Sequence, residues 1–568
     1  MDDETTAPTL HRTSLLHRPP DLYPTSVNSE TDSRVQVVWF KRDLRVRDHA
    51  PLLEAAACGP LVGLYLYEPE LLQSPDWDPI HSRFIQEALR ELESELASRG
   101  VRLVTRVGEA VEQLEALHRA RPFVGLWSHE ETGNRITFDR DRRVARWCAD
   151  RGVVWTERRQ DGVIRRLRSR EGWAERWNRT MSTRLLPAPE TLPAAPADRL
   201  PSAGILGPAE LGLRDAGDRE LQPGGERQAR DVLDSFLAER GVGYRRDMSS
   251  PVAGWTGCSR LSPYLAWGCI SIRTVHQAAT ARAEALRLER TAGNTVDGRW
   301  WGSLSSFQAR LRWHCHFMQK LEDEPRIEFE NFVRAYDGLR EPFTESDEGQ
   351  ERLRAWCDGR TGYPMVDACL RAVRATGWLN FRMRAMVMSF ASYALGLHWR
   401  PTALHLARCF LDFEPGIHFS QAQMQSGTTG INTLRIYSPA KQAIDHDPRG
   451  QFIRRWVPEL EGVPDALLPQ PERMSLSQQE QAGCVIGVDY PRPIVEFRRA
   501  TAEARRRIYA VRSGDEARQQ ARAVYQRHGS RRRTGHRGAS ADARLREALG
   551  TEPDLPGGEN WTQPELFG

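Results

Sequence analysis

The sequence lacks the signatures of the common metal, phosphate and hydrolase sites. Its nine cysteines include no CxxC pair, a spacing that suits neither a disulfide framework nor a zinc or iron–sulfur site. The chain has no GxxxxGK[ST] loop, no GxGxxG after the first predicted strand, no HExxH and no GxSxG. We therefore expect a reduced, cytoplasmic protein without a metal.

Long apolar runs and lysine are also scarce. No stretch of about 18 apolar residues occurs, which argues against a membrane partner. Only three lysines, Lys41, Lys320 and Lys441, stand among the 80 basic residues, and the net charge of +4 is small for 568 residues. Guanidinium groups recognise anions only where they converge on one acceptor. Composition alone therefore neither indicates nor excludes nucleic acid.

The first half of the chain has the rhythm of a parallel sheet. Short apolar runs at 35–40, 61–67, 101–107, 123–127 and 153–156 have the length of buried strands. Amphipathic segments such as 83–99 separate them, and this βαβ alternation predicts a doubly wound α/β domain.

The second half reads as helical. In TGYPMVDACLRAVRATG, Pro364 suits a first helical turn, Val366, Leu370 and Val373 form one apolar stripe, and Gly377 can end the helix. The predicted order is a disordered leader (1–33), an α/β domain (34–165), a linker (166–225), an all-α domain (226–510) and a basic, partly disordered tail (511–568).

A serine-rich segment stands out in the helical half. Ser259 and Ser262, with the amides of a helix start at Pro263, could cradle a pyrophosphate, because short hydroxyls and free backbone N–H groups bind such an anion. The alternative is that a serine before proline only caps a helix.

The order of several motifs resembles the photolyase/cryptochrome family. They are VVWFKRDLRVRDHAPL, SRLSPYLAWGCIS, GRTGYPMVDA, WLNFRMR and LDFEPG, and they span about residues 34 to 510. The resemblance is to an atypical member, not to a well-known subclass. It implies an antenna-type α/β domain, a helical domain that binds FAD, an undetermined antenna chromophore, a monomer, and UV-damaged DNA as a candidate partner.

The resemblance also implies the flavin site. The FAD-binding positions it implies are Tyr244, Cys258, Ser259, Leu261, Ser262, Phe307, Phe381, Arg384, Asp412, Glu414 and His418. Arg384 and Asp412 would form an ion pair beside the isoalloxazine ring, where an arginine stabilises the reduced anion. Cys258 replaces a hydroxyl residue of the family.

By the same resemblance, His418 would fall opposite flavin N5. A histidine there could exchange a proton with the flavin, since its ordinary pKa lies near physiological pH; the alternative is a hydrogen-bonded structural histidine. Ala422 and Ser346 fall at two positions of the tryptophan chain that carries electrons to the flavin, and only Trp399, in the middle, remains. We expect the usual photoreduction route to fail.

A detour for electrons would need another tryptophan. Trp378, Trp356 and Trp313 are the candidates.

The substrate pocket departs from the family as well. Trp313 stands where a tryptophan packs against a flipped lesion, but Arg310 replaces the Glu or Gln that reads it, exchanging a hydrogen-bond acceptor for a cation. Phe381 and Ala385 occupy two positions that are histidines in (6-4) photolyases. His314 replaces an arginine and is expected near the flavin or the substrate mouth, with plain packing as the alternative.

A metal site at His314-Cys315-His316 is not expected. On a helix, side chains two residues apart diverge by about 200°, so the two imidazoles cannot share one ion.

Three functional hypotheses stay open. The leading one is a blue-light-absorbing flavoprotein with a diverged pocket, acting as a photoreceptor or on an atypical substrate. The alternative is a light-dependent DNA photolyase that repairs UV lesions by electron transfer from reduced FAD. A third, a light-independent flavin- or nucleic-acid-binding module, would be favoured if bound FAD resisted photoreduction.

Overall fold

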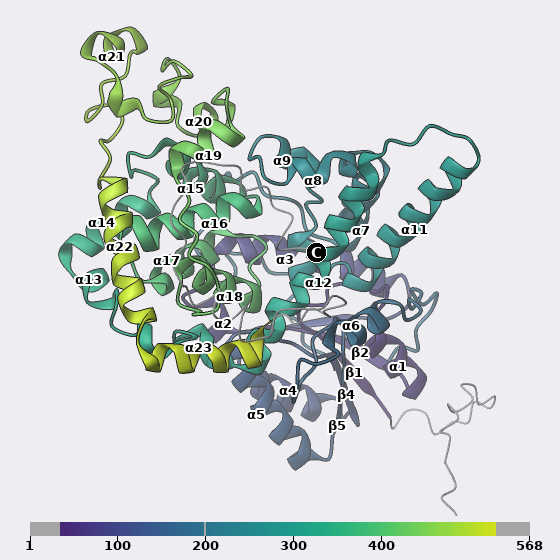
Figure 1. Ribbon diagram of the computed structural model, residues 1–568. Helices are drawn as coiled ribbons and strands as arrows, with labels where there is room; N and C mark the ends of the chain where they lie inside the picture. Colours follow the sequence, from purple (N-terminus) through teal and green to yellow (C-terminus); the bar gives the residue numbers. More distant parts are fainter. Residues whose placement is uncertain (1–33, 198–199, 530–568) are drawn as a thin grey trace, which may run out of the picture.

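A five-stranded parallel sheet forms the first part of the chain (Figure 1). The computed structural model describes residues 34–197 and 200–529, so the predicted leader lies outside the described residues. The strands, in the spatial order β3-β2-β1-β4-β5, are β1 Gln36–Phe40, β2 Leu61–Tyr67, β3 Leu103–Val107, β4 Gly125–His129 and β5 Val154–Arg158. The five strands predicted from apolar runs, and their parallel pairing, are confirmed.

Helices cover both faces of this sheet. They are α1 Ala50–Cys58, α2 Pro69–Leu72, α3 Pro79–Ala97, α4 Ala110–Ala120 and α5 Arg135–Arg151. Successive side chains of a strand point to opposite faces. Val37 and Trp39 accordingly share one core with α4 and α5, whereas Val38 and Phe40 share another with α1 and α3. The doubly wound arrangement is confirmed.

The rest of the described chain is mostly helical. Its helices are α6 Trp173–Met181, α7 Glu226–Ala238, α8 Tyr244–Asp247, α9 Ala253–Gly257, α10 Ser262–Ala266, α11 Ile272–Thr291, α12 Arg299–Asp323, α13 Glu341–Glu345, α14 Asp347–Cys357, α15 Pro364–Thr376, α16 Phe381–Ser389, α17 Trp399–Cys409, α18 Pro415–Ser426, α19 Pro439–His446, α20 Gln451–Trp456, α21 Leu476–Ala482, α22 Phe497–Arg512 and α23 Asp515–His528. Single turns lie at Arg240–Gly243, Pro325–Glu328, Arg334–Tyr336, Pro458–Leu460 and Pro471–Arg473, and a π-helical turn at Phe390–Ala394 follows α16. Helix α15 begins and ends as predicted, with Gly377 at φ 70° as its C-cap.

Two helices lie in segments expected to be linker or tail. Helix α6 falls within 166–225, and its Trp173, Trp177 and Met181 are buried. Their spacing of four residues places them on one face of a helix. Helix α23 falls within 511–568 and buries Ala517 and Ala521. The remainder of that tail, from residue 530, lies outside the described residues.

The sheet and the helical part share one hydrophobic core. It runs from Phe40 on the sheet through α3 to Tyr264 on α10 and Leu311 on α12. Gly268 marks the closest backbone approach: a Cβ there would lie 2.1 Å from the Arg42 carbonyl oxygen, and its φ of 66° also favours glycine. The loop after β1 is thereby fixed against the segment that follows α10.

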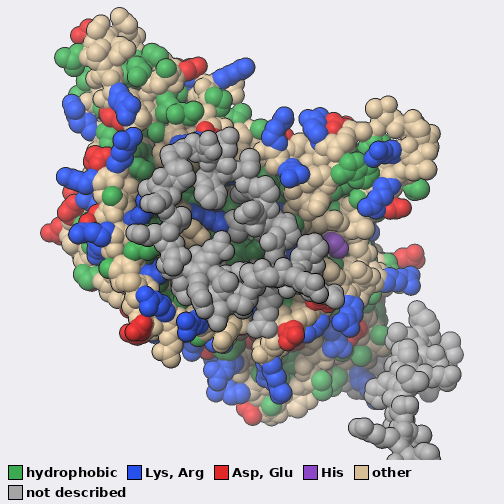
Figure 2. All heavy atoms as spheres, in the orientation of Figure 1, with side chains coloured by type: hydrophobic (Ala, Val, Ile, Leu, Met, Phe, Trp, Pro, Cys, Tyr) green, Lys and Arg blue, Asp and Glu red, His purple; other side chains and the backbone are tan. Residues whose placement is uncertain are grey.

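The visible face carries charges of both signs. Figure 2 shows Lys and Arg side chains interspersed with Asp and Glu over the described part of that face. No helix of the described residues is long and apolar enough to cross a membrane.

Candidate cofactor site

The predicted site residues come from neighbouring elements of the helical part. Helix α12 packs against α8 and α18, and α16 packs against α18. Tyr244 lies on α8, Cys258, Ser259 and Leu261 between α9 and α10, Ser262 at the start of α10, Phe307, Arg310, Trp313 and His314 on α12, Phe381 and Arg384 on α16, Asp412 and Glu414 before α18, and His418 on α18.

Arg384 and Asp412 form a bidentate ion pair. The two guanidinium nitrogens lie 3.0 and 2.8 Å from the two carboxylate oxygens, and Arg384 Nε donates to the Leu379 carbonyl at 2.8 Å. The guanidinium also stacks 3.9 Å from the Phe410 ring centre. Such a fork holds the arginine in one orientation. The structure therefore brings the two residues together as the resemblance implies.

Aromatic side chains wall the site beside α12. Tyr244 meets Phe236 and Phe307 edge to face, with ring centres 5.6 and 5.8 Å apart. Burial raises the pKa of Tyr244 well above its usual value, so its hydroxyl keeps its proton.

The serine segment does not use its hydroxyls as helix caps. Helix α10 begins at Ser262 without a side-chain capping bond, and Ser259 Oγ accepts only a long bond, 3.5 Å, from the Leu261 amide. The capping alternative is thus not what the structure shows. Burial raises the pKa of the neighbouring Cys258 thiol to about 12, so it stays neutral.

Arg260 is a residue that the sequence reasoning missed. Two indole rings meet edge to face, and its guanidinium lies in the corner between them, 4.2 Å from the ring centre of Trp255 and 4.0 Å from that of Trp378. Gln222 holds it from both sides: Arg260 Nε donates to Gln222 Oε1, and Gln222 Nε2 donates to the Arg260 carbonyl, each at 3.0 Å. Arg260 also has a φ of 62°, unusual outside glycine. Its place between the two candidate serines was the available signal.

Buried polar atoms without partners test whether the site fits a polar cofactor. Within the described residues, Arg260 Nη1, Asn380 Oδ1, His314 Nδ1 and Arg382 Nε are buried and make no hydrogen bond. Buried polar groups are almost always paired, and leaving each unpaired costs about 1–3 kcal/mol. A cofactor rich in donors and acceptors, such as FAD, fits a site with such atoms.

His418 differs from its expected behaviour. Its Nε2 donates to the Ala403 carbonyl at 2.7 Å, and Phe413 and Phe419 meet its ring edge to face. Loss of contact with water lowers the pKa of His418 to about 4. The expectation of a histidine pKa near physiological pH is therefore wrong, because the Ala403 carbonyl of α17 and the rings of Phe413 and Phe419 enclose the imidazole. His418 is neutral at pH 7.

The residues expected around a substrate share one side of α12. Arg310 Nη2 lies 3.7 Å from Met248 Sδ, and the guanidinium lies 5.4 Å from the ring centre of Phe381, which is 37% exposed. Trp313 packs against Phe317 at 5.5 Å.

The imidazoles of the His-Cys-His run point to different neighbours. His316 Nδ1 meets Arg170 Nη1 at 3.3 Å, whereas His314 lines a cavity between the two parts of the molecule.

The three residues expected at tryptophan-chain positions make structural contacts. Ser346 caps α14 by accepting a bond from the Gly349 amide at 3.1 Å. Trp399 is fully buried, donates to Asn331 Oδ1 at 2.8 Å and meets Phe419 at 6.4 Å. Ala422 is buried on α18.

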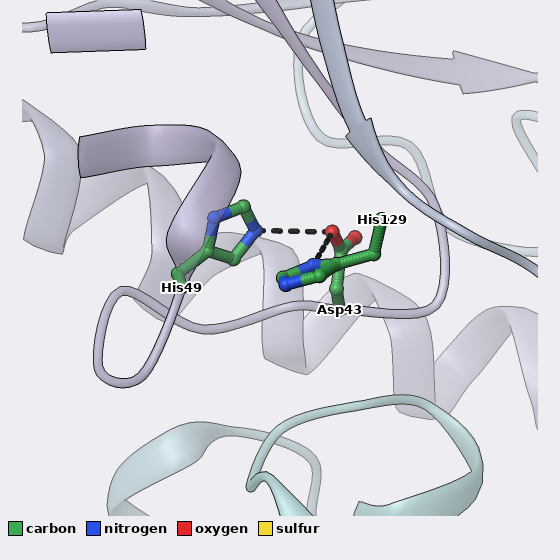
Figure 3. Close-up of side chains that lie close together, drawn as sticks. All are labelled: Asp43, His49 and His129. Carbon is green, nitrogen blue, oxygen red and sulfur yellow. Dashed lines mark hydrogen bonds and ion pairs between the residues drawn. The ribbon is translucent and has the colours of Figure 1, made fainter. Parts of the chain in front are cut away.

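A buried histidine–aspartate cluster lies outside this site. Figure 3 shows the rings of His49 and His129 converging on Asp43, whose Oδ2 accepts at 3.0 and 2.8 Å. His49 Nδ1 accepts from the Leu52 amide at the start of α1, so its proton sits on Nε2. Burial opposes ionisation, but these bonds hold the pKa of Asp43 well below its usual range. Both nitrogens of His49 are used, and the arrangement suits a hydrogen-bonded cluster better than a metal.

Comparison with protein families decides what this site belongs to. Residues 36–167 match a family model described as DNA photolyase, and residues 307–510 match one described as the FAD binding domain of DNA photolyase. The chain belongs to the photolyase/cryptochrome family. Its helical part is thus an FAD-binding domain, and the expectation of FAD is confirmed.

The relatives that this chain resembles include proteins named cryptochrome and proteins named photolyase. Cryptochrome DASH of Gloeobacter violaceus is 27% identical over 493 residues, which cover 83% of this chain and 95% of that protein. A deoxyribodipyrimidine photo-lyase of Halobacterium salinarum is 28% identical over 501 residues, 83% of this chain and 98% of that protein. A bacterial class III photolyase from Agrobacterium tumefaciens has the same fold, with a TM-score of 0.74, 24% identity, and coverage of 86% of this chain and all of that one.

Proposed function

We propose that this family member is a blue-light-absorbing flavoprotein with a diverged substrate pocket, acting as a photoreceptor or on an atypical substrate. The observation that carries the proposal is Arg310 on the pocket side of α12, with its guanidinium over Phe381. A guanidinium has only donors, so it cannot accept the hydrogen bond by which a thymine N–H would be read.

The chain's own residues bind and orient the cofactor. Asp412 holds Arg384 in one direction, so that the arginine presents a fixed positive charge. Arg260 Nη1 and Asn380 Oδ1 offer a buried donor and a buried acceptor. Bound FAD supplies absorption of blue light and electron transfer. A cytoplasmic, monomeric protein with an unidentified antenna chromophore stays a prediction.

A second candidate is a DNA photolyase acting on UV-damaged DNA. It is favoured by Trp313, a half-buried indole one helical turn after Arg310, since a flipped base stacks on such a ring. Electron transfer to a lesion needs proximity more than acid–base groups. The presence of Arg310 therefore counts less strongly against a photolyase than it would against an enzyme that works by proton transfer.

Blue-light repair by purified, FAD-loaded and chemically reduced protein tests the two candidates. The substrates are oligonucleotides with either a cyclobutane dimer or a (6-4) photoproduct, and chromatography separates the products. We expect no restored thymines with either lesion. Thymines restored in light and not in darkness would overturn the proposal in favour of the photolyase. Arg310→Glu, which returns an acceptor, is the matched variant: it should gain repair if Arg310 blocks lesion binding.

A further inference from the structure

A small cavity lies between the carboxyl ends of the strands and the helical part. Its volume is about 30 Å³, room for one or two water molecules. Arg42 and Asp161 from the α/β part line it, as do His314 and Glu414 from the helical part. It therefore joins the domain interface to Glu414, a predicted FAD-binding residue, and to His314, which is expected near the flavin or the substrate mouth.

Glu414 is a buried carboxyl with weak charge compensation. It is 6% exposed, and the ion pair it makes within the described chain is with Arg42 Nη1, at 3.5 Å. That guanidinium is shared: it donates to the Phe413 carbonyl at 3.0 Å and lies 4.3 Å over the Trp267 ring. A buried carboxylate needs close donors to stay ionised. Arg42, at 3.5 Å and shared with other groups, stabilises the ionised form of Glu414 only weakly.

Other acidic groups face the same region. Glu131 and Asp161 line the cavity, and Asp412 stands two residues before Glu414. Burial, then the negative charge of Asp161, Glu131 and Asp412, raises the pKa of Glu414 to about 8, although Arg42 opposes this. Burial also raises the pKa of Asp161 to about 6. Glu414 therefore holds a proton at pH 7.

We propose that Glu414 is a proton donor to the flavin site, releasing its proton through cavity water when the cofactor is reduced. The inference rests on FAD binding. The carboxyl O–H bond breaks, the proton passes toward the reduced cofactor, and the carboxylate remains beside Arg42. Both electrons come from an external reductant, here dithionite. His314 Nδ1, buried without a partner in the described chain, can accept a hydrogen bond from the water and orient it.

Infrared difference spectra, reduced minus oxidised, test this in FAD-loaded protein at pH 7. We expect wild type to lose a carbonyl-stretch band of a protonated carboxyl, and Glu414→Gln to lack that band. Asp161→Asn should keep it. The matched control is Glu345→Gln, because Glu345 is exposed at the end of α13. Its difference spectrum should be the same as that of wild type.

Wild type alone gives a second readout if a variant does not fold. Because burial raises the pKa of Glu414 to about 8, we expect the band to weaken as the pH rises, about tenfold at about pH 9. A band that persists in Glu414→Gln, that is unchanged at pH 9, or that is missing from wild type with fully reduced FAD would overturn the inference. Protein that binds no FAD would instead contradict the proposed function.

Discussion

Arg384 and Arg260 are both enclosed guanidinium groups near the cofactor site, but their partners differ. Arg384 faces the Asp412 carboxylate at 2.8 Å, so its charge is compensated within the protein. Arg260 faces two indole rings and an amide, and burial lowers its pKa to about 10. Arg260 still carries a full charge at pH 7 and keeps a buried Nη1 without a partner. An anionic group, such as a phosphate of FAD, is therefore stabilised more by Arg260 than by Arg384.

Replacing Arg384 by alanine should weaken FAD binding. The change removes the positive charge and leaves Asp412, whose side chain is 3% exposed, without its partner. A hydrogen bond from a charged group is worth about 1.5–3 kcal/mol; because Arg384 is 27% exposed, we expect the FAD-binding free energy to fall by about 2 kcal/mol, or about 30-fold weaker binding. Flavin absorbance per mole of purified protein measures the effect.

The matched control for this variant is Arg374→Ala. Arg374 lies on α15, is 48% exposed and pairs with Asp358 at 3.7 Å. It should keep wild-type FAD content. Full FAD occupancy in Arg384→Ala would refute the assigned role.

His418 should not control the pH dependence of the flavin. With a pKa near 4, it is neutral from about pH 5 upward, and its Nε2 proton is held by Ala403. We expect the reduction potential of bound FAD to show the same dependence on pH, between pH 5.5 and 8, in wild type and His418→Asn, apart from a constant offset. An inflection near pH 6.5 that disappears in the variant would contradict the low pKa.

At the residue scale, the sequence predicted which residues form an ion pair better than it predicted the surroundings of a single side chain. The Arg384–Asp412 pair could be expected because two motifs indicated it together. The surroundings of His418 could not, since Ala403 and Phe410 belong to a different helix and loop. Arg260 was passed over because its indole partners, Trp255 and Trp378, come from separate segments.

At the scale of elements, apolar runs predicted the five strands of the described sheet, the helical character of the second half of the chain, and α15 in particular. Helices α6 and α23 were not expected, because their sequences are rich in charge and carry only a narrow apolar stripe. Composition therefore assigned them to linker and tail. A stripe spaced by four residues, as in Trp173, Trp177 and Met181, was the signal that composition concealed.

The expected loss of the usual electron route rests on the residues at the start of α14, at the start of α17 and on α18. Trp399 begins α17 deep in the protein, while Ser346 on one side is a helix cap and Ala422 on the other is a methyl group. Trp378 is a poor detour, because the Arg260 cation 4.0 Å from its ring disfavours a second positive charge on the indole.

Replacing Trp399 by phenylalanine should therefore change light-driven FAD reduction by less than about twofold. Absorbance under blue light with an external thiol present records the rate, and chemical reduction in the dark confirms that the variant binds redox-active FAD. A loss of tenfold or more would show that Trp399 conducts through another partner.

At the scale of the whole molecule, one core joins the two domains. The pattern of strands and helices in the sequence predicted two domains but not how tightly they meet, because this depends on contacts between segments far apart in the chain. Gly268 against Arg42, and His81 on α3 against the Phe410 carbonyl at 3.0 Å, are such contacts. The segment before α18, which carries the predicted flavin-site residues Asp412 and Glu414, is thus held in part by the α/β domain.

Acid should loosen this interface through His81. Its Nδ1 accepts from the Asp78 amide at 3.2 Å and its Nε2 donates to Phe410, so the fold requires the neutral ring, and burial lowers its pKa to about 4. The unfolded chain, with a pKa near 6.5, binds more protons between pH 6.5 and 4. The contribution of His81 is therefore complete above pH 6.5 and falls with pH, by about 2 kcal/mol at pH 5. Urea unfolding at pH 7 and 5 measures it, and in His81→Gln, whose amide can both donate and accept, the difference should shrink by that amount. An unchanged difference would show that His81 is not the responsible group.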